Sequence, residues 1–587
     1  MTIARTDPAF LAACRGDEPA DLVLKGGRFV NVFTREIVEA SVAIFGGRFA
    51  CIGEQTQARQ VVDVGGRYIA PGLIDAHMHC ESTCMLPSSF VGVAAPHGTT
   101  GVVFDPHEIA NVLGIEGIRF LMDESVGLPM HIMFAASSCV PSSPLETSGA
   151  RLEAEDLTPL FDDDRVVALA EMMNFPGVVH ADAGVLAKVA LGLDKRIVDG
   201  HAPGLTGPAL SAYVGAGISS DHEATTAAEA LEKVRLGMQV YIREGSAARN
   251  LEALVPAVTQ ANAHRFCLCT DDRHPGDLAS EGHIDHVVRK AVRLGLDPVT
   301  ALAMASVHAA NHYRQPDLGA IAPGRLADLI VFEDLSDIRP QQVYFQGRRI
   351  AEDGSMLVVP KVAGKGGAAS ARRPTVILPA SLDESSFAIP VDAADKTPAS
   401  RIRVIVADPH QLYTAEKIVE PKVTDGLYIA DPSRDLLKLC VIERHGKGGG
   451  IGRGFVTGFG FSGGALASTV GHDAHNLAVV GDNDADMLVA ARTLAECGGG
   501  QCVIRGGEVL ATLRLPIAGL ISDASPQVVI AEQWALLDAA HAIGCPLDDP
   551  FMPLSFLTLP VIPKLKLTDL GLVDVDFFEI VPLAIEG

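Results

Sequence analysis

Two histidines, His77 and His79, lie two residues apart at the end of an apolar run that starts at Gly72. In a β-strand, side chains at positions i and i+2 point to the same face of the sheet. Two imidazoles at the end of such a strand can therefore reach one metal ion together. A His-x-His pair alone is not specific, because such pairs also occur on surfaces and in cores. It gains weight here because further ligand-type residues follow other apolar runs.

These further residues are Glu171, His201, His222 and the neighbouring pair Asp271 and Asp272. Taken singly, each has an ordinary structural explanation. A buried carboxylate is costly without a partner and is often a salt bridge, a histidine is often hydrogen-bonded, and an aspartate often caps a helix. Together, four histidines and two carboxylates at strand ends suit two divalent ions, since one catalytic zinc needs only three or four ligands. We expect a carboxylate with two oxygens, Glu171, to bridge them.

The elements that must position these residues lie between about 67 and 320, where apolar segments that end in polar residues alternate with helical stretches. This alternation is typical of βα units and a parallel sheet. Eight such units predict a (β/α)8 TIM-like barrel, in which functional residues lie at the C-terminal ends of the strands. The candidate strands are 70–77, 99–104, 131–136, 166–172, 195–200, 217–220, 239–242 and 266–270.

The segments on either side of the barrel predict two further domains, so that the whole chain belongs to the α/β class. Residues 1–66 contain short β-branched runs separated by Gly-Gly pairs, and 322–362 have the same character, which favours one small composite β-sandwich. The barrel then occupies 67–321. A Gly- and Ala-rich linker follows at 363–373, and 374–587 are expected to form a C-terminal α/β domain.

The composition excludes several classes of function. The chain has 47 Lys and Arg against 72 Asp and Glu, a formal net charge of −25, which disfavours binding to nucleic acid or to an anionic membrane. No apolar run is long enough to span a bilayer, and the N-terminal segment lacks the apolar core of a signal peptide. The eleven cysteines are scattered. We therefore expect reduced thiols, a cytosolic location and a small-molecule substrate.

Several motifs in the chain resemble the amidohydrolase superfamily and, within it, the bacterial metal-dependent adenine deaminases. The resemblance covers nearly the whole chain. The His-x-His opening is shared by many amidohydrolases, whereas the block near residue 471 is more specific to adenine deaminases. The motifs are PGLIDAHMH (71–79), HGTTGVVFDPHEIANVLG (97–114), REGSAARNL (243–251), CTDDRHP (269–275), GHDAHN (471–476) and LPVIPKLKLTD (559–569).

The resemblance implies a site with two divalent ions. It implies two pairs of histidine ligands, His77 with His79 and His201 with His222. Glu171 would bridge the ions where many relatives use a carboxylated lysine, and the absence of lysine from 166–175 agrees with this. Asp271 would be the ligand after the eighth strand, with Asp272 behind it. The mixed N and O ligands fit Mn or Fe, with Zn as a further option.

The implied reaction is hydrolytic deamination of adenine to hypoxanthine and ammonia. A metal-bound hydroxide would attack C6 of the purine, because coordination lowers the pKa of water to about 7. Asp271 would take its proton and pass it to the leaving amine, and His107 or Glu108 would protonate N1. Capping or a salt-bridge network explains His107 and Glu108 equally well. The residues expected at the substrate are Glu81, Asp105, Arg243, Glu244, Ser246 and Asp272.

Two polar segments of the C-terminal region have competing interpretations. His472, Asp473 and His475 are expected to belong to a loop that helps close the pocket rather than to a further metal site. The glycine-rich segment 446–454 lacks the order GxxxxGK[ST] of a phosphate-binding loop and is expected to be a flexible turn.

Three alternative functions were weighed. A cyclic-amide or N-acyl hydrolase uses the same metal ligands. A non-catalytic scaffold is expected to have lost ligands, whereas this chain retains all six. A nucleic-acid deaminase is disfavoured by the charge and by the absence of the signature that combines H-x-E with P-C-x-x-C. The family resemblance also implies a homodimer.

Overall fold

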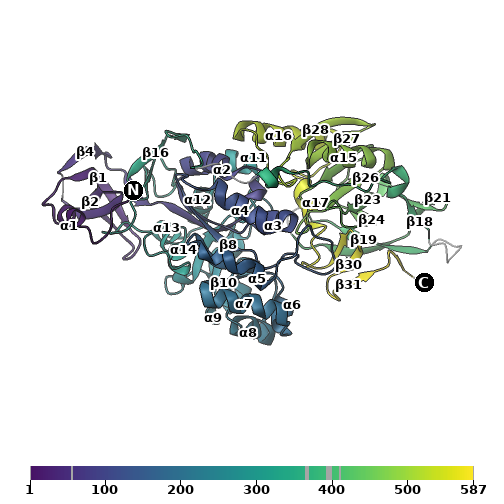
Figure 1. Cartoon of the computed structure of the whole chain (residues 1–587), viewed down its shortest axis with the longest axis horizontal. Coiled ribbons are helices and arrows are strands. Elements are labelled where there is room, and N and C mark those ends of the chain that lie inside the picture. Colours follow the sequence, from purple (N-terminus) through teal and green to yellow (C-terminus); the bar gives the residue numbers. More distant parts are fainter. Residues whose placement is uncertain (1, 55–56, 364–368, 392–398, 409–411, 586–587) are drawn as a thin grey trace.

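The computed structural model describes residues 2–54, 57–363, 369–391, 399–408 and 412–585. The molecule is elongated, with a strand-rich part at one end, a mixed middle part, and a second mixed part at the other end (Figure 1). The strand-rich part contains the beginning of the chain, and the far part contains the C-terminal third. In these described ranges, none of the helices has the length and hydropathy needed to cross a bilayer.

The strand-rich part contains one sheet. Its strands come from the chain segments that precede and follow the middle part. Its strands are β1 (Ala20–Asn31), β2 (Glu36–Phe45), β3 (Arg48–Gly53), β4 (Ala58–Asp63), β5 (Tyr68–Pro71), β14 (Leu329–Phe332), β15 (Gln342–Phe345), β16 (Arg348–Glu352) and β17 (Ser355–Met356), with helix α1 (Pro8–Arg15) beside them. The order is β17-β16-β15-β14-β5-β1-β2-β3, with β4 paired to β1. The antiparallel pair of β5 and β14 joins the first and last segments of this part.

The prediction of one strand at 70–77 was wrong, because this segment contains parts of two strands. The chain forms β5, which belongs to the first sheet, and then β6 (Leu73–Met78), which starts the middle part. Gly72 separates the two. A Cβ atom at Gly72 would lie 2.1 Å from Thr100 Oγ1, so the backbone here passes too close to its neighbour for any side chain.

The middle part contains eight parallel strands in chain order. They are β6, β7 (Thr99–Phe104), β8 (His131–Ala136), β9 (Val166–Met172), β10 (Ile197–Gly200), β11 (Ser220–Asp221), β12 (Gln239–Arg243) and β13 (Phe266–Cys269). The first five pair side by side, as do the last three. The Ser219 N–H donates to the Val198 carbonyl (2.9 Å) between the two groups, and a parallel bridge joins Met78 to Asp271. Strand β11 is shorter and later than the expected strand 217–220.

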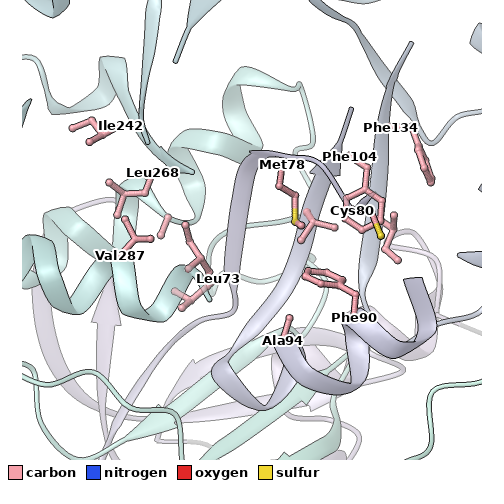
Figure 2. Close-up of a cluster of buried hydrophobic side chains, with 14 of the residues drawn as sticks. Leu73, Met78, Cys80, Phe90, Ala94, Phe104, Phe134, Ile242, Leu268 and Val287 are labelled. Carbon is pink, nitrogen blue, oxygen red and sulfur yellow. The ribbon is translucent and has the colours of Figure 1, made fainter. Parts of the chain in front are cut away.

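Helices alternate with these strands and cover their outer faces. The main ones are α2 (Pro87–Ala94), α3 (His107–Leu113), α4 (Ile115–Glu124), α7 (Ala183–Lys195), α8 (Gly207–Gly215), α9 (Ala227–Arg235), α11 (Pro275–Ser280), α12 (Ile284–Arg293), α13 (Pro298–Met304) and α14 (Val307–His312). Figure 2 shows Phe90 of α2 beside Phe104 of β7, with ring centroids 5.6 Å apart, and Val287 of α12 near Leu268 of β13. All four side chains are fully buried, which explains why these strands read as nearly continuous apolar runs.

The C-terminal part is built on a second sheet. Its strands are β19 (Arg401–Val406), β20 (Ala415–Val419), β23 (Leu437–Ile442), β24 (Ile451–Thr457), β25 (Ala465–Ser468), β26 (Leu477–Gly481), β27 (Gly500–Arg505), β28 (Glu508–Arg514) and β32 (Ala584–Ile585). Helices α15 (Asp484–Cys497) and α16 (Pro526–Ala542) contact its strands β27 and β28. A short helix, α17 (Phe551–Phe556), and a small sheet of β29 (Leu565–Thr568), β30 (Gly571–Asp574) and β31 (Glu579–Val581) follow.

The prediction of a flexible turn at 446–454 was wrong for its second half, because 451–454 belong to β24 and only 446–450 form the connection before that strand. The Glu443 carboxylate accepts hydrogen bonds from the N–H groups of Lys447, Gly448 and Gly449, at 2.9, 3.0 and 3.0 Å. The anion bound by this loop is therefore a side chain of the protein itself.

Candidate active site

The six residues expected to bind metal lie together at one end of the parallel strands. His77 is near the end of β6 and Glu171 near the end of β9. His79, His201 and His222 directly follow β6, β10 and β11, and Asp271 is the second residue after β13. The carboxyl ends of parallel strands meet at one edge, so these side chains converge. Their exposed fractions are low: His77 2%, His79 3%, Glu171 3%, His201 6%, His222 2% and Asp271 1%.

Glu171 lies between two pairs of histidines. Its Oε1 is 3.8 Å from His77 Nε2 and 3.5 Å from His79 Nε2. Its Oε2 is 2.7 Å from His201 Nδ1 and 3.1 Å from His222 Nε2. Each carboxylate oxygen therefore faces one histidine pair.

Asp271 faces the same cluster from the opposite strand. Its Oδ1 is 3.4 Å from His79 Nε2, and its Oδ2 is 3.4 Å from His222 Nε2. The backbone φ of Asp271 is 58°, a left-handed conformation that is uncommon for residues other than glycine. The Asp271 N–H donates to the His77 carbonyl at 3.0 Å, which fixes this turn against the end of β6.

The donor set fits divalent cations. Ligand atoms of three overlapping groups lie within 4.8 Å of one another: His77, His79 and Glu171; Glu171, His201 and His222; and His77, His222 and Asp271. His77 Nε2 is buried and has no hydrogen-bond partner among the described residues. Its carboxylate neighbours at 3.8 Å are too distant for hydrogen bonds. His79 Nδ1 is 2.9 Å from the Asp105 carbonyl, an orienting contact that leaves Nε2 directed at the cluster.

Arg243 lies behind the cluster, in a network of carboxylates. Its Nη1 is 2.6 Å from Glu223 Oε1 and 2.9 Å from Asp271 Oδ2, and its Nη2 is 2.8 Å from Asp272 Oδ2. Burial favours the neutral acid, but Arg243 and His79 hold the pKa of Asp271 well below its usual range. We expected Arg243 at the substrate; it does line the cavity over the cluster, and its guanidinium is also engaged by these carboxylates. Glu223 was not predicted, although it directly follows His222 in the sequence.

Glu81 and Glu108 form a second acidic group beside the cluster. Glu81 Oε1 accepts the Ile109 N–H at 3.0 Å and so caps the first turn of α3. Ser82 Oγ donates to Glu108 Oε1 at 3.2 Å and contacts Asp272 Oδ1 at 2.6 Å. Burial, reinforced by the Glu81 carboxylate, raises the pKa of Glu108 well above its usual range. Glu108 is therefore suited to carry a proton at neutral pH.

His107 lies between carboxylates from both halves of the chain. Its Nδ1 is 3.5 Å from Asp105 Oδ1, and its Nε2 is 3.7 Å from Asp473 Oδ1. Burial alone would lower the pKa of His107, but Asp105 and Asp473 raise it well above its usual range. The GHDAHN segment thus reaches the metal-ligand cluster, where His472 and Asp473 line the cavity. His475 does not line it, and its Nδ1 accepts the Gly471 N–H at 3.2 Å.

Two residues expected at the substrate are placed elsewhere. Glu244 is fully buried and pairs with Lys290 Nζ at 2.5 Å. Ser246 Oγ accepts the His274 N–H at 2.8 Å and borders a separate cavity next to Trp534. Both follow β12, but their side chains do not line the cavity at the cluster.

The cavity over the cluster is small and is bordered by apolar residues to which the sequence assigned no role, although Leu559 and Ile562 lie in the motif at 559–569. It offers about 20 Å³ to the centres of water molecules. Met173 borders it directly after β9, and four residues border it from the C-terminal part: Leu412, Phe556, Leu559 and Ile562. An apolar side chain carries no chemical signature, so only the structure identifies these residues.

Comparison with known proteins identifies the family of this chain. Residues 68–350 match the model of the amidohydrolase family, and residues 411–579 match that of the adenine deaminase C-terminal domain. An adenine deaminase of Desulfatibacillum aliphaticivorans is 46% identical over 98% of this chain and 99% of its own. An adenine deaminase of Nitratidesulfovibrio vulgaris (strain DP4) is 48% identical over 96% of this chain and 96% of its own. An adenine deaminase of Methanothrix thermoacetophila is 44% identical over 98% of this chain and 99% of its own. The chain therefore belongs to the adenine deaminase family of the amidohydrolase superfamily.

Proposed function

We propose that the protein is an adenine aminohydrolase, which converts adenine and water into hypoxanthine and ammonia. The observation that carries this proposal is the position of Glu171 between two histidine pairs, in a chain whose relatives over nearly its full length are named adenine deaminases. The proposed architecture is a closed (β/α)8 barrel at 67–321, a composite β-sandwich domain of 1–66 and 322–362, and a C-terminal α/β domain at 374–587.

The proposed metal centre holds two divalent ions. His77 and His79 would bind one ion and His201 and His222 the other, with Glu171 shared and Asp271 as the remaining ligand. Bound divalent ions lower the pKa of a coordinated water and so supply a nucleophile at neutral pH. Mn or Fe suits the nitrogen and oxygen donors, and Zn is compatible with them.

The proton transfers are assigned to three side chains. Asp271 is held as a carboxylate by Arg243 and His79, so it can accept the proton of the attacking water and deliver it to the leaving amine. Glu108, whose pKa is raised, would donate a proton to N1 of the base. Asp105 and Asp473 raise the pKa of His107 against the effect of burial, so His107 is the second candidate for this donation.

The other residues predicted at the substrate fall into two groups, those near the acid–base side chains and those outside the proposed pocket. Glu81, Asp105 and Asp272 surround the acid–base groups and would orient them through the contacts described above. Arg243 would fix the carboxylates of Asp271 and Asp272 rather than the purine. Glu244 and Ser246 are left out of the proposed pocket. The homodimer and the cytosolic location remain predictions.

The experiment that tests the proposal is an assay of the apo-protein reloaded with Mn, Fe or Zn. Adenine should yield hypoxanthine and ammonia in equal amounts. Cyclic amides such as hydantoin and dihydrouracil should not be opened at a comparable rate. Ring-opened acids from these cyclic amides, without turnover of adenine, would establish the alternative cyclic-amide hydrolase instead.

A further inference from the structure

The cavity at the metal-ligand cluster has a polar floor and an apolar cover. The floor consists of the ionisable side chains at the ends of the barrel strands. The cover comes from the region that matches the adenine deaminase C-terminal domain. Its members, which we call the apolar roof, are Leu412, Phe556, Leu559 and Ile562. The metal-binding and proton-transfer roles proposed above all fall on polar side chains, so the roof is left as a candidate for recognition of the base.

The roof contains a flat aromatic pair. The ring of Phe556, the last residue of α17, stacks on the imidazole of His472 with centroids 4.4 Å apart and planes at 12°. Both residues line the cavity. Aromatic rings prefer stacked or edge-to-face partners, so a flat aromatic ligand that enters the cavity can pack against this pair.

Lys566 connects the separate segments of the roof. Its side chain is fully buried, and its Nζ donates to the carbonyls of Leu412 and Phe556, at 2.9 Å each. No carboxylate pairs with Lys566 in the described part of the chain. Burying an ammonium group without a counter-ion is costly. The two hydrogen bonds that offset this cost are both accepted by backbone carbonyls of roof residues. Lys566 therefore fixes where these two residues lie.

Other polar contacts and a small apolar cluster complete the attachment of the roof. Thr558 Oγ1 donates to the His472 carbonyl, and the His472 N–H donates to the Ser555 carbonyl, both at 2.8 Å. The roof residues form their own hydrophobic cluster with Met552 and Ala248, separate from the larger cores. The position of the roof thus depends on a few identifiable bonds.

The size of the cavity brings the substrate into contact with the roof. The space of about 20 Å³ accommodates roughly one water molecule. A bicyclic base that reaches the proposed metal ligands is therefore expected to lie directly against the roof residues that line this cavity.

We propose that Phe556 is the stacking face for the substrate ring and that Lys566 is the positioning residue that holds it. In this arrangement the C-terminal domain selects flat heteroaromatic bases, while the barrel supplies the hydrolytic groups. The inference rests on the proposed adenine aminohydrolase function and specifies which residues recognise the base.

The test compares Phe556→Leu and Phe556→Tyr in the full-length, metal-loaded enzyme. Phe556→Leu should raise KM for adenine about fivefold to tenfold, as loss of one aromatic pair implies, while kcat changes less than twofold. The inhibition constant of unsubstituted purine, which carries no amine to remove, should rise by the same factor. Phe556→Tyr keeps the ring and should retain the wild-type KM.

Lys566→Met provides an independent variant that leaves Phe556 in place. It should raise KM and the purine inhibition constant in the same direction, with unchanged metal content. The matched control is Lys438→Met, which removes another buried lysine of the same domain, one that contacts Asp484 and the Phe387 carbonyl. This control should leave both constants unchanged, which separates loss of the roof contact from general loss of stability.

The outcomes distinguish this inference from the proposed function. If wild-type protein does not deaminate adenine with any of the three metals, the proposed function is wrong. If it does, but Phe556→Leu and Lys566→Met both keep the wild-type KM and purine inhibition constant, only the inference about the roof is overturned. If Phe556→Leu fails to fold, the comparison of Lys566→Met with Lys438→Met decides.

Discussion

Glu171 Oε2 and His201 Nδ1 lie 2.7 Å apart, at the ends of neighbouring strands β9 and β10, with both side chains almost completely buried. The other oxygen of Glu171 faces His79, so this one carboxylate connects the two histidine pairs. In the proposed two-ion site, this carboxylate would supply both a negative charge and a second ligand oxygen. The site therefore depends more on Glu171 than on any single histidine.

Glu171→Gln is expected to lower bound metal and to reduce adenine deamination by at least about 100-fold. The amide keeps the size of the side chain but offers one oxygen and no charge. Even residues behind metal ligands typically contribute 10- to 100-fold in affinity or activity. Metal analysis and steady-state assays test this, and full metal content together with full activity would contradict the bridging role.

Arg243→Met is expected to destabilise the fold by about 3–5 kcal/mol, because it leaves the buried carboxylates of Glu223, Asp271 and Asp272 without their cation. Urea unfolding of the apo-protein measures the loss. Arg514→Met is a suitable control, since Arg514 pairs with Glu532 at the surface and should change stability by less than about 1 kcal/mol. Equal effects of the two substitutions would show that the Arg243 network does not stabilise the site.

Glu108→Gln is expected to lower kcat by about 100-fold or more, as loss of a general acid does. The pKa of Glu108 is raised, so its protonated form is present at neutral pH and is lost as the pH rises through that pKa. Wild-type kcat should therefore fall on the alkaline side, and the variant should lose this limb of the pH profile. An unchanged alkaline limb in the variant would assign it to another group, with His107 as the next candidate.

Lys566→Met is expected to change how stability depends on pH. Burial lowers the pKa of Lys566 from 10.5 to about 7, so between these values the unfolded chain binds more protons than the folded one. The contribution of Lys566 to stability then increases with pH in this window, with a slope of up to ~1.4 kcal/mol per pH unit. Unfolding at pH 7.5 and 9.5 should show a steeper rise for wild type than for the variant, and parallel curves would contradict this.

The sequence was most informative where a strand ends in a polar residue. The strands 99–104, 131–136 and 166–172 coincide with β7, β8 and β9, because long apolar segments bounded by polar residues leave little freedom in their limits. The short β11 and the break at Gly72 were not predicted. Both depend on pairing and close approach between distant segments, which the local sequence pattern does not contain.

The same contrast holds for the site. His77, Glu171 and Asp271 were identifiable because their chemistry is visible in their residue types. The actual partners of Arg243 and the separation of Ser246 from the cluster depend on which way a side chain turns after its strand ends. The roof residues Leu412 and Phe556 come from distant apolar segments, and only the tertiary structure places them over the metal ligands.

The most direct test of the account is a titration of metal-free protein with Mn while adenine deamination and bound metal are measured together. The account predicts that activity rises until two ions are bound per chain and then stays constant. Full activity with one bound ion, or no conversion of adenine to hypoxanthine in protein that holds two, would contradict it.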